Sequence, residues 1–217
     1  MKYELTNEVI EYLGVKLHRI RALKGFGNVK KGELGGFVEK ESNLNQIANA
    51  WVYGNAKVYG NAEVYGNAKV FGDAKVSGNA KVYGNAEVYG NAWVYGDAKV
   101  SGDAKASGNA DVYGNAWVYG DAWVYGNAWV YGNAEVYGNA WVSSKKDISV
   151  INNVGSENGT LTAFNTNDGI YVNRGCFYGS LEDFEEAVKK THKNSKTAKE
   201  YRILIKYIKL RLSKGDE

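Results

Sequence analysis

The sequence predicts an all-β protein whose central part is a parallel β-helix. From Trp51 to Lys146 the chain repeats every six residues, and each unit reads approximately x-Val-Tyr-Gly-Asn-Ala. Val and Ala recur at fixed places in the unit, and Gly-Asn or Gly-Asp follows almost every strand-like segment. A short extended segment and a bend, repeated without interruption, indicate a solenoid rather than a globular sheet.

The hexad explains how such a coil closes. Side chains of a strand alternate with period two, so Val and Ala share the inward face. The Gly-Asn pair tolerates the positive φ of a sharp corner. We expect a strand of about four residues and a turn of about two, with three units closing a triangular coil. Burial of each inward side chain contributes roughly 1 to 3 kcal/mol to the stability of the fold. Asn residues that stack at a repeated corner predict ladders of side-chain amide hydrogen bonds along the axis.

The ends of the repeat divide the chain into three regions. Residues 1–38 are expected to form an N-terminal cap, residues 39–147 a β-helix of about five to six coils, and residues 148–217 a small α+β C-terminal domain. Alternating residues predict strands at 15–23, 148–154, 160–164 and 170–172, whereas a capping-box-like start and an apolar stripe predict helices from Ser180 and over 195–212.

The Val-x-Gly-Asn-Ala spacing resembles the hexapeptide-repeat superfamily, which is best known for trimeric acyltransferases. The resemblance covers about half of the chain and implies a left-handed coil, although the general crossover rule favours right-handed connections. Residues 26–38 resemble the entry segment of bacterial and prophage hexapeptide-repeat proteins. The tail resembles a small C-terminal module of phage proteins, carried by Gly155-Ser156, Thr162, Asp168-Gly169-Ile170, Gly175-Cys176-Phe177, Phe184, Thr191-His192 and Glu200-Tyr201. It departs from that module at Glu157 and Lys193, where Arg and Gly are expected.

The outward residues are unusually aromatic, with 17 tyrosines and 6 tryptophans in the chain. A tyrosine ladder that stabilises the sheet without any ligand explains the tyrosines. Tryptophans that gather near the end of the coil favour an interface with another protein, and sugar stacking is a weaker alternative. The interface candidates are Trp93, Trp117, Trp123, Trp129, Trp141, Tyr119, Tyr125 and Tyr131.

Two groups of basic residues are candidates for binding phosphate. Lys69, Lys75 and Lys81 form a ring around one coil, and Lys199, Arg202, Lys206 and Lys209 form a stripe on the last helix. A solvated face is the favoured explanation of the lysine ring. A solvated amphipathic helix that docks on the end of the coil is the favoured explanation of the stripe. The net charge of +3 is mild, acidic residues precede the stripe, and no aromatic set interleaves with it, so we expect at most weak, salt-sensitive binding of nucleic acid.

The sequence predicts no catalytic residue, cofactor or metal site. Hexapeptide acyltransferases use a histidine on the coil or its loops, whereas His18 and His192 flank the repeat here. Cys176 with His192 is the one residual candidate for a nucleophile and base, against a reading as a structural cysteine and a helix-end histidine.

These observations favour a non-enzymatic phage or prophage protein that self-associates, as a trimer or dimer, and presents an aromatic β-helix surface to a protein partner. Inhibition of a host-defence protein is the most specific form of this hypothesis. The alternatives are a divergent acyltransferase-like enzyme and a nucleic-acid-binding protein. A single cysteine, no apolar signal core and no membrane span favour the cytoplasm, that of the host cell if a phage encodes the chain.

Overall fold

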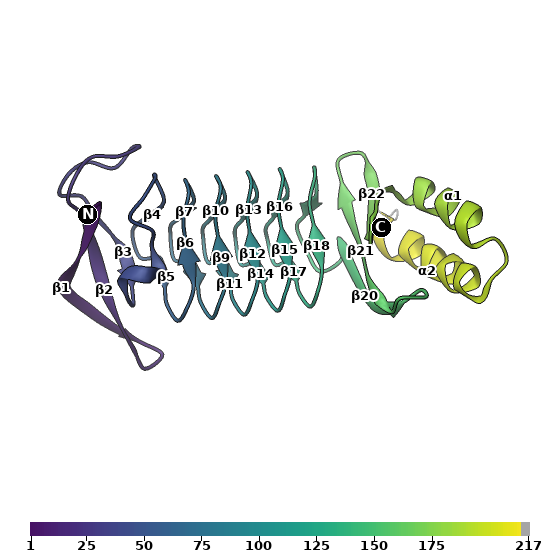
Figure 1. Ribbon diagram of the computed structural model, residues 1–217, viewed down its shortest axis with the longest axis horizontal. Coiled ribbons are helices and arrows are strands. Elements are labelled where there is room, and N and C mark those ends of the chain that lie inside the picture. The colour runs from purple at the N-terminus through teal and green to yellow at the C-terminus, as the bar shows by residue number, and fades with distance from the viewer. Residues whose placement is uncertain (214–217) are drawn as a thin grey trace.

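The computed structural model describes residues 1–213 as an elongated rod, with a parallel β-solenoid of about six turns between two different end structures (Figure 1). The fold class predicted from the hexads is confirmed. The handedness of the coil remains a prediction from family resemblance.

The N-terminal end structure is a hairpin that continues into the solenoid. Strands β1 (Tyr3–Tyr12) and β2 (Val15–Ala22) pair antiparallel, and β2 pairs antiparallel with β3 (Leu34–Val38). Strand β3 then pairs in parallel with β5 (Lys57–Val58), which places Phe37 beside Lys57. The parallel ladder therefore begins inside the region expected to be a cap, before residue 39, because these residues pair with the first repeats despite lacking the hexad pattern.

The solenoid has three faces, named here after their first strands. The β4 face contains β4 (Trp51–Val52), β7 (Lys69–Val70), β10 (Glu87–Val88), β13 (Lys105–Ala106), β16 (Trp123–Val124) and β19 (Trp141–Val142). The β5 face contains β5, β8 (Lys75–Val76), β11 (Trp93–Val94), β14 (Asp111–Val112) and β17 (Trp129–Val130). The β6 face contains β6 (Glu63–Val64), β9 (Lys81–Val82), β12 (Lys99–Val100), β15 (Trp117–Val118) and β18 (Glu135–Val136). A short 3-10 helix, η1 (Glu41–Asn43), precedes the β6 face in the first turn, where Leu44 forms a parallel bridge with Val64.

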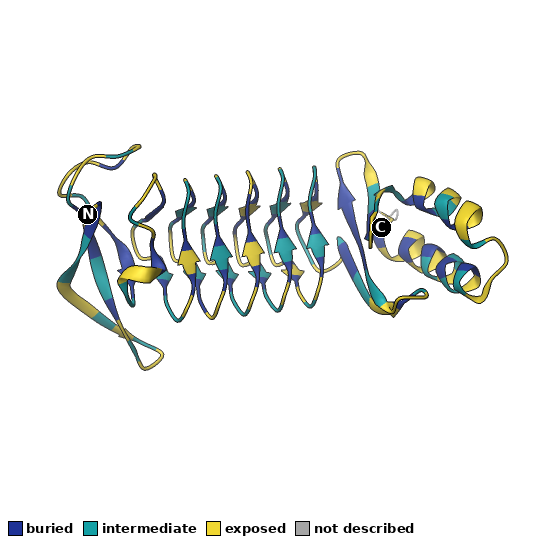
Figure 2. Ribbon diagram, viewed as in Figure 1, coloured by how far each residue is buried: buried dark blue, intermediate teal, exposed yellow. Residues whose placement is uncertain are grey.

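The strands are shorter than the four residues expected from the hexad. Each comprises two residues, because the glycine two positions after the valine already turns with a positive φ, for example +71° at Gly96. The inward positions are confirmed: Val and Ala of the repeats form one buried core along the axis. In Figure 2 dark blue residues recur in every coil, between teal and yellow ones. The amide ladders are also confirmed, as in the bonds from Asn49 to Asn67 (3.2 Å) and from Asn67 to Asn85 (3.1 Å).

The C-terminal domain closes the other end of the rod. Strands β20 (Ile148–Val154), β21 (Gly159–Thr166), β22 (Gly169–Arg174) and β23 (Phe177–Ser180) form an antiparallel sheet. Ile148 and Phe164 complete the buried core of the solenoid, so one face of this sheet covers the last coil. Strand β23 was not predicted, because four residues around Gly179 carry no clear alternation.

Two helices cover the opposite face of that sheet (Figure 1). Ser180 caps the N-terminus of helix α1 (Leu181–His192), and Ser195 caps that of helix α2 (Lys196–Leu212). Each serine hydroxyl accepts a hydrogen bond from a backbone N–H of the first turn. Both helices follow the prediction. Helix α2, however, packs on the sheet rather than on the end of the coil, because the sheet already occupies that end.

Candidate functional site

The tryptophans predicted to gather near the end of the coil are distributed over three faces. Trp117 lies on the β6 face, Trp129 on the β5 face, and Trp123 with Trp141 on the β4 face. A step of six residues moves the chain to the next face, so tryptophans 6 or 12 residues apart lie on different faces and those 18 apart are neighbours on one face. Trp123 and Trp141 are such a pair, with ring centroids 4.8 Å apart. Trp51, the first in the repeat, is fully buried under Tyr3 and Phe26 of the cap.

Three tryptophans occupy notches that serines leave in the tyrosine ladders. Trp93, Trp117 and Trp123 each donate an indole hydrogen bond of 2.9 Å to the hydroxyl of the serine 16 residues earlier, in bonds to Ser77, Ser101 and Ser107 respectively. A lysine 18 residues earlier lies over each indole at 5.5 to 6.0 Å, and the tyrosine two residues later packs against it at 4.5 to 4.9 Å. A Lys-x-Ser segment therefore receives a Trp-x-Tyr segment on the next coil, which gives these indoles a structural role.

Trp129 and Trp141 lack this arrangement and are the most exposed tryptophans of residues 1–213. The residues 16 positions before them are Tyr113 and Tyr125, so no notch receives the indole, and each tryptophan is 39% exposed. The ammonium of Lys145 lies 3.0 Å from the Trp129 ring centroid. These two indoles therefore remain the available candidates for an interface.

The notch model predicts a coupled pair of substitutions. Ser101→Tyr fills the space of the Trp117 indole and lowers the free energy of unfolding by about 1 to 3 kcal/mol. Trp117→Thr empties the notch and is also destabilising. The double variant restores an ordinary tyrosine ladder on this edge. Its loss in the free energy of unfolding is therefore smaller than the sum of the two single losses by at least about 1 kcal/mol. Chemical unfolding of the four proteins measures this coupling, and strictly additive losses would contradict the model.

The ring of lysines is divided among the three faces and is engaged by neighbouring coils. Lys69 pairs with Glu87 at 3.1 Å, Lys81 pairs with Glu63 at 3.5 Å, and Lys75 lies over Trp93. A single phosphate cannot contact three ammonium groups that point from three sides of a rod. These residues are best described as stabilising contacts between coils.

The basic stripe of α2 is partly neutralised. Lys209 pairs with Glu185 of α1 at 3.0 Å, and Arg202 donates to the backbone carbonyl of Lys193 at 2.7 Å. Hydrogen bonds from Lys189 and Lys209 hold the pKa of Glu185 below its usual value, so this carboxylate stays charged near neutrality. Lys199 and Lys206 remain exposed.

An apolar surface lies where α2 meets the last coil, and we call it the junction surface. Trp129 and Tyr131 of the β5 edge and Tyr207 of α2 line a cavity of about 250 Å³ at this place. Ile203 and Leu210 precede and follow Tyr207 on the helix and are 68% and 83% exposed. Spacings of four and three put all three helix residues on one side. This surface was not predicted, because Ile203, Tyr207 and Leu210 lie outside the apolar stripe that packs on the sheet.

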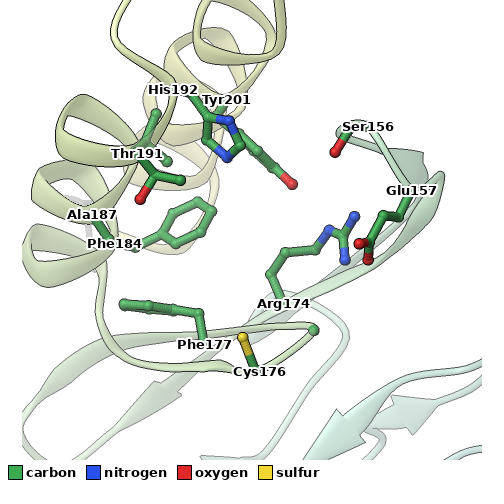
Figure 3. A pocket seen from close by; sticks show the side chains of 12 residues that line it. Ser156, Glu157, Arg174, Cys176, Phe177, Phe184, Ala187, Thr191, His192 and Tyr201 are labelled. Carbon is green, nitrogen blue, oxygen red and sulfur yellow. The ribbon is translucent and has the colours of Figure 1, made fainter.

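The C-terminal domain contains a second cavity of about 440 Å³, the terminal cavity, at the far end of the rod (Figure 3). Cys176, at the turn between β22 and β23, and His192, at the end of α1, both line it. No hydrogen bond joins these two side chains within residues 1–213, and Figure 3 shows them at opposite edges of the cavity. The structure thus places the residual catalytic pair in one cavity but not in contact.

The geometry defines a β-solenoid repeat protein, and one comparison with known families agrees. Residues 80–96 and 110–126 match the family model described as the YdcK Beta solenoid repeat. The two matches lie within the coil and concern its fold. No curated protein matches the chain. Among residues 1–213, no three His, Cys, Asp or Glu side chains gather as ligands of a metal ion, and no helix is long and apolar enough to cross a membrane.

Proposed function

We propose that the chain is a non-enzymatic, rigid scaffold that binds a protein partner through the junction surface. The carrying observation is that Trp129 and Tyr131 of the coil share a cavity with Tyr207 of α2, and that Ile203 and Leu210 lie on the same side of the helix as Tyr207. All five side chains are at least 39% exposed. Contiguous apolar exposure of this kind is typical of interaction sites. The members of the surface are Trp129, Tyr131, Ile203, Tyr207 and Leu210.

The charged residues near the junction surface indicate which kind of protein segment it would bind. Arg211 lines the cavity of the junction surface, and the exposed residues Lys199 and Lys206 lie within about one helical turn of Ile203 and Tyr207, so the neighbouring charges of α2 are basic. The one acid of this helix, Glu200, accepts a hydrogen bond from the backbone N–H of Gly155. Two copies of this surface would repel each other, whereas an amphipathic segment with acidic residues beside its apolar ones is complementary. The proposed occupant is such a segment of another protein.

A matched capture experiment tests this proposal. The full chain, the variant Ile203→Asp/Leu210→Asp, and the variant Ile47→Asp are each used to capture proteins from lysate. Ile47 is 77% exposed near the opposite end of the chain and controls for the loss of an exposed apolar side chain. We expect the full chain and Ile47→Asp to retain a protein that Ile203→Asp/Leu210→Asp does not retain. Crosslinking should join an acidic amphipathic segment of that protein to α2. Equal capture by all three, or crosslinks only elsewhere, would contradict the proposal.

We also propose self-association through the β4 face, where Trp141 stands exposed beside Trp123. Asp103, Asp121 and Lys105 border these indoles, and this mixture of signs permits contact between copies. We expect light scattering at micromolar concentration to give a dimer or trimer, and Trp141→Ser to shift the protein toward the monomer. A mass of 23.8 kDa for the unmodified chain would refute self-association.

The remaining parts of the hypothesis stand on sequence alone. A non-enzymatic role is supported by the absence of histidine from residues 51–146, so no acetyl transfer from acetyl coenzyme A is expected. Turnover that disappears in His192→Ala would promote the acyltransferase alternative. Phage origin, inhibition of a host-defence protein and a cytoplasmic location are proposed from the resemblance of the flanking segments and the single cysteine.

A further inference from the structure

The terminal cavity combines an aromatic wall with polar side chains that lack partners. Phe177 and Phe184 pack with ring centroids 5.1 Å apart, and Tyr201 meets Phe184 edge-on at 5.3 Å. His192 lies 5.7 Å from the Tyr201 ring and extends the wall. Four segments supply the lining of the cavity: the turn between β20 and β21, the turn between β22 and β23 with the strand residues beside it, α1 and α2. A concave, mainly apolar cavity with a few polar groups is the usual form of a small-molecule site.

Arg174 is the fixed charge of the cavity. One terminal nitrogen of its guanidinium, Nη2, donates to the carbonyl of Val154 at 2.7 Å, which fixes the side chain against the sheet. Its Nε is buried without a hydrogen-bond partner. Neither ring nitrogen of His192 has a hydrogen-bond partner within the described chain, and Thr191 adds a hydroxyl to the same wall. Arg174 and His192 therefore both have nitrogen atoms without a hydrogen-bond partner in the lining of a mainly apolar cavity.

Glu157 is the negatively charged residue of the cavity lining, and, unlike Arg174, it has no hydrogen bond that fixes its side chain in residues 1–213. It is exposed on the turn between β20 and β21, and Figure 3 shows its carboxylate on the same side of the cavity as the Arg174 guanidinium. Because no ion pair of 4.0 Å or less joins the two groups in residues 1–213, the arginine is not neutralised by direct contact. A bound anion would compete with this carboxylate for Arg174.

From this arrangement we infer that the terminal cavity binds a small aromatic anion, an aryl carboxylate or aryl phosphate. The ring of the ligand packs against Phe177 and Phe184, and its anionic group accepts hydrogen bonds from the Arg174 guanidinium, with Thr191 and His192 as further donors. Glu157 weakens binding through repulsion of the anion. This site is separate from the junction surface and does not depend on the proposed protein partner.

Cys176 allows the inference to be tested without a label elsewhere. It is the one cysteine of the chain, it is exposed, and it lines the cavity. A ligand in the cavity shields its thiol. The rate of alkylation by iodoacetamide is measured on the full chain with increasing 1-naphthoate, 1-naphthyl phosphate or neutral 1-naphthalenemethanol, and calorimetry gives the dissociation constants independently.

We expect at least one of the two anions to slow alkylation fivefold or more, and the neutral alcohol to have at least tenfold weaker affinity. Comparison of naphthoate with the phosphate identifies the preferred anion.

Arg174→Gln should weaken anion binding tenfold or more, whereas Glu157→Gln should tighten it. Arg211→Gln, remote from the cavity, should leave binding unchanged. If Arg174→Gln fails to fold, Ala187→Trp, which fills the cavity from α1, must abolish binding. Equal affinity for the neutral alcohol, tight binding that survives Ala187→Trp, or no binding by either anion would overturn the inference.

Discussion

Replacement of Gly108 by alanine is expected to destabilise the solenoid by about 2 to 5 kcal/mol. Gly108 has a φ of +65°, which costs an L-residue roughly 1 to 2 kcal/mol. An added Cβ would also lie 2.9 Å from the backbone nitrogen and 3.0 Å from the oxygen of Gly126 on the next coil. That oxygen accepts a 2.7 Å bond from the Asn109 N–H, so the coils cannot separate there without weakening the ladder. Overpacking of this kind adds about 1 to 3 kcal/mol.

Gly132 provides the matched control. Its φ is +64°, nearly that of Gly108, but an added Cβ would meet no atom within 4 Å because no further coil follows at this edge. Gly132→Ala should therefore lower the free energy of unfolding by only about 1 kcal/mol, because the lower conformational entropy of the unfolded chain offsets part of the backbone strain. Denaturant unfolding followed by tryptophan fluorescence compares the two variants. Equal losses would show that backbone conformation alone, and not the close contact of stacked corners, requires glycine here.

The features that the sequence predicts well are those decided by local, repeated chemistry. Val64 and Ala68 point inward because of their places in the hexad. The amide ladders form because Asn recurs at the same corner of successive coils, 18 residues apart. Helices α1 and α2 begin at Ser180 and Ser195 because a serine hydroxyl there satisfies a free backbone N–H. None of these features needs knowledge of a distant partner.

The features that escaped prediction depend on contacts distant in sequence. Phe37 lies beside Lys57 although residues 34–38 have no hexad pattern. Trp51 is buried because the cap folds over it, and Tyr178 of the C-terminal sheet stacks on Tyr137 at 4.1 Å, which extends a tyrosine ladder beyond the coil. The terminal cavity likewise requires two turns and two helices to meet.

One part of the candidate site could have been found in the sequence. A step of six residues changes the face, so Trp117, Trp123 and Trp129 could never have formed one patch. The offset of 16 residues between serine and tryptophan marks the three indoles that donate to a serine. Trp129 and Trp141 have a tyrosine at that offset instead and remain more exposed. The junction surface could not be found in this way, because it also needs the position of Tyr207 relative to the coil.

Lys2 sets a pH dependence of stability that the sequence does not reveal. Its side chain is 1% exposed, its ammonium donates to the carbonyl of Ala50 at 2.8 Å, and it lies 4.9 Å from the Phe26 ring centroid. Burial, with a smaller contribution from the nearby charge of Lys24, lowers the pKa of Lys2 from 10.5 to about 8. The unfolded chain therefore binds a proton that the folded chain has lost throughout the window between these two values.

Since the unfolded state holds more protons in that window, stability rises with pH from about 8 to 10.5, and the contribution is lost as the pH falls through 8. The free energy of unfolding of the unmodified chain, minus that of Lys2→Met, should increase by about 2 kcal/mol between pH 7.5 and 9.5. Ionisation of tyrosines affects both proteins and cancels in the difference. The exposed Lys31, changed to Met, should give a difference that stays flat. A flat difference for Lys2→Met as well would mean that the Lys2 ammonium reaches solvent. The N-terminal hairpin would then enclose Lys2 less tightly than its two hydrogen bonds imply, one from the ammonium to the Ala50 carbonyl and one from the backbone N–H to the Gln46 side-chain oxygen.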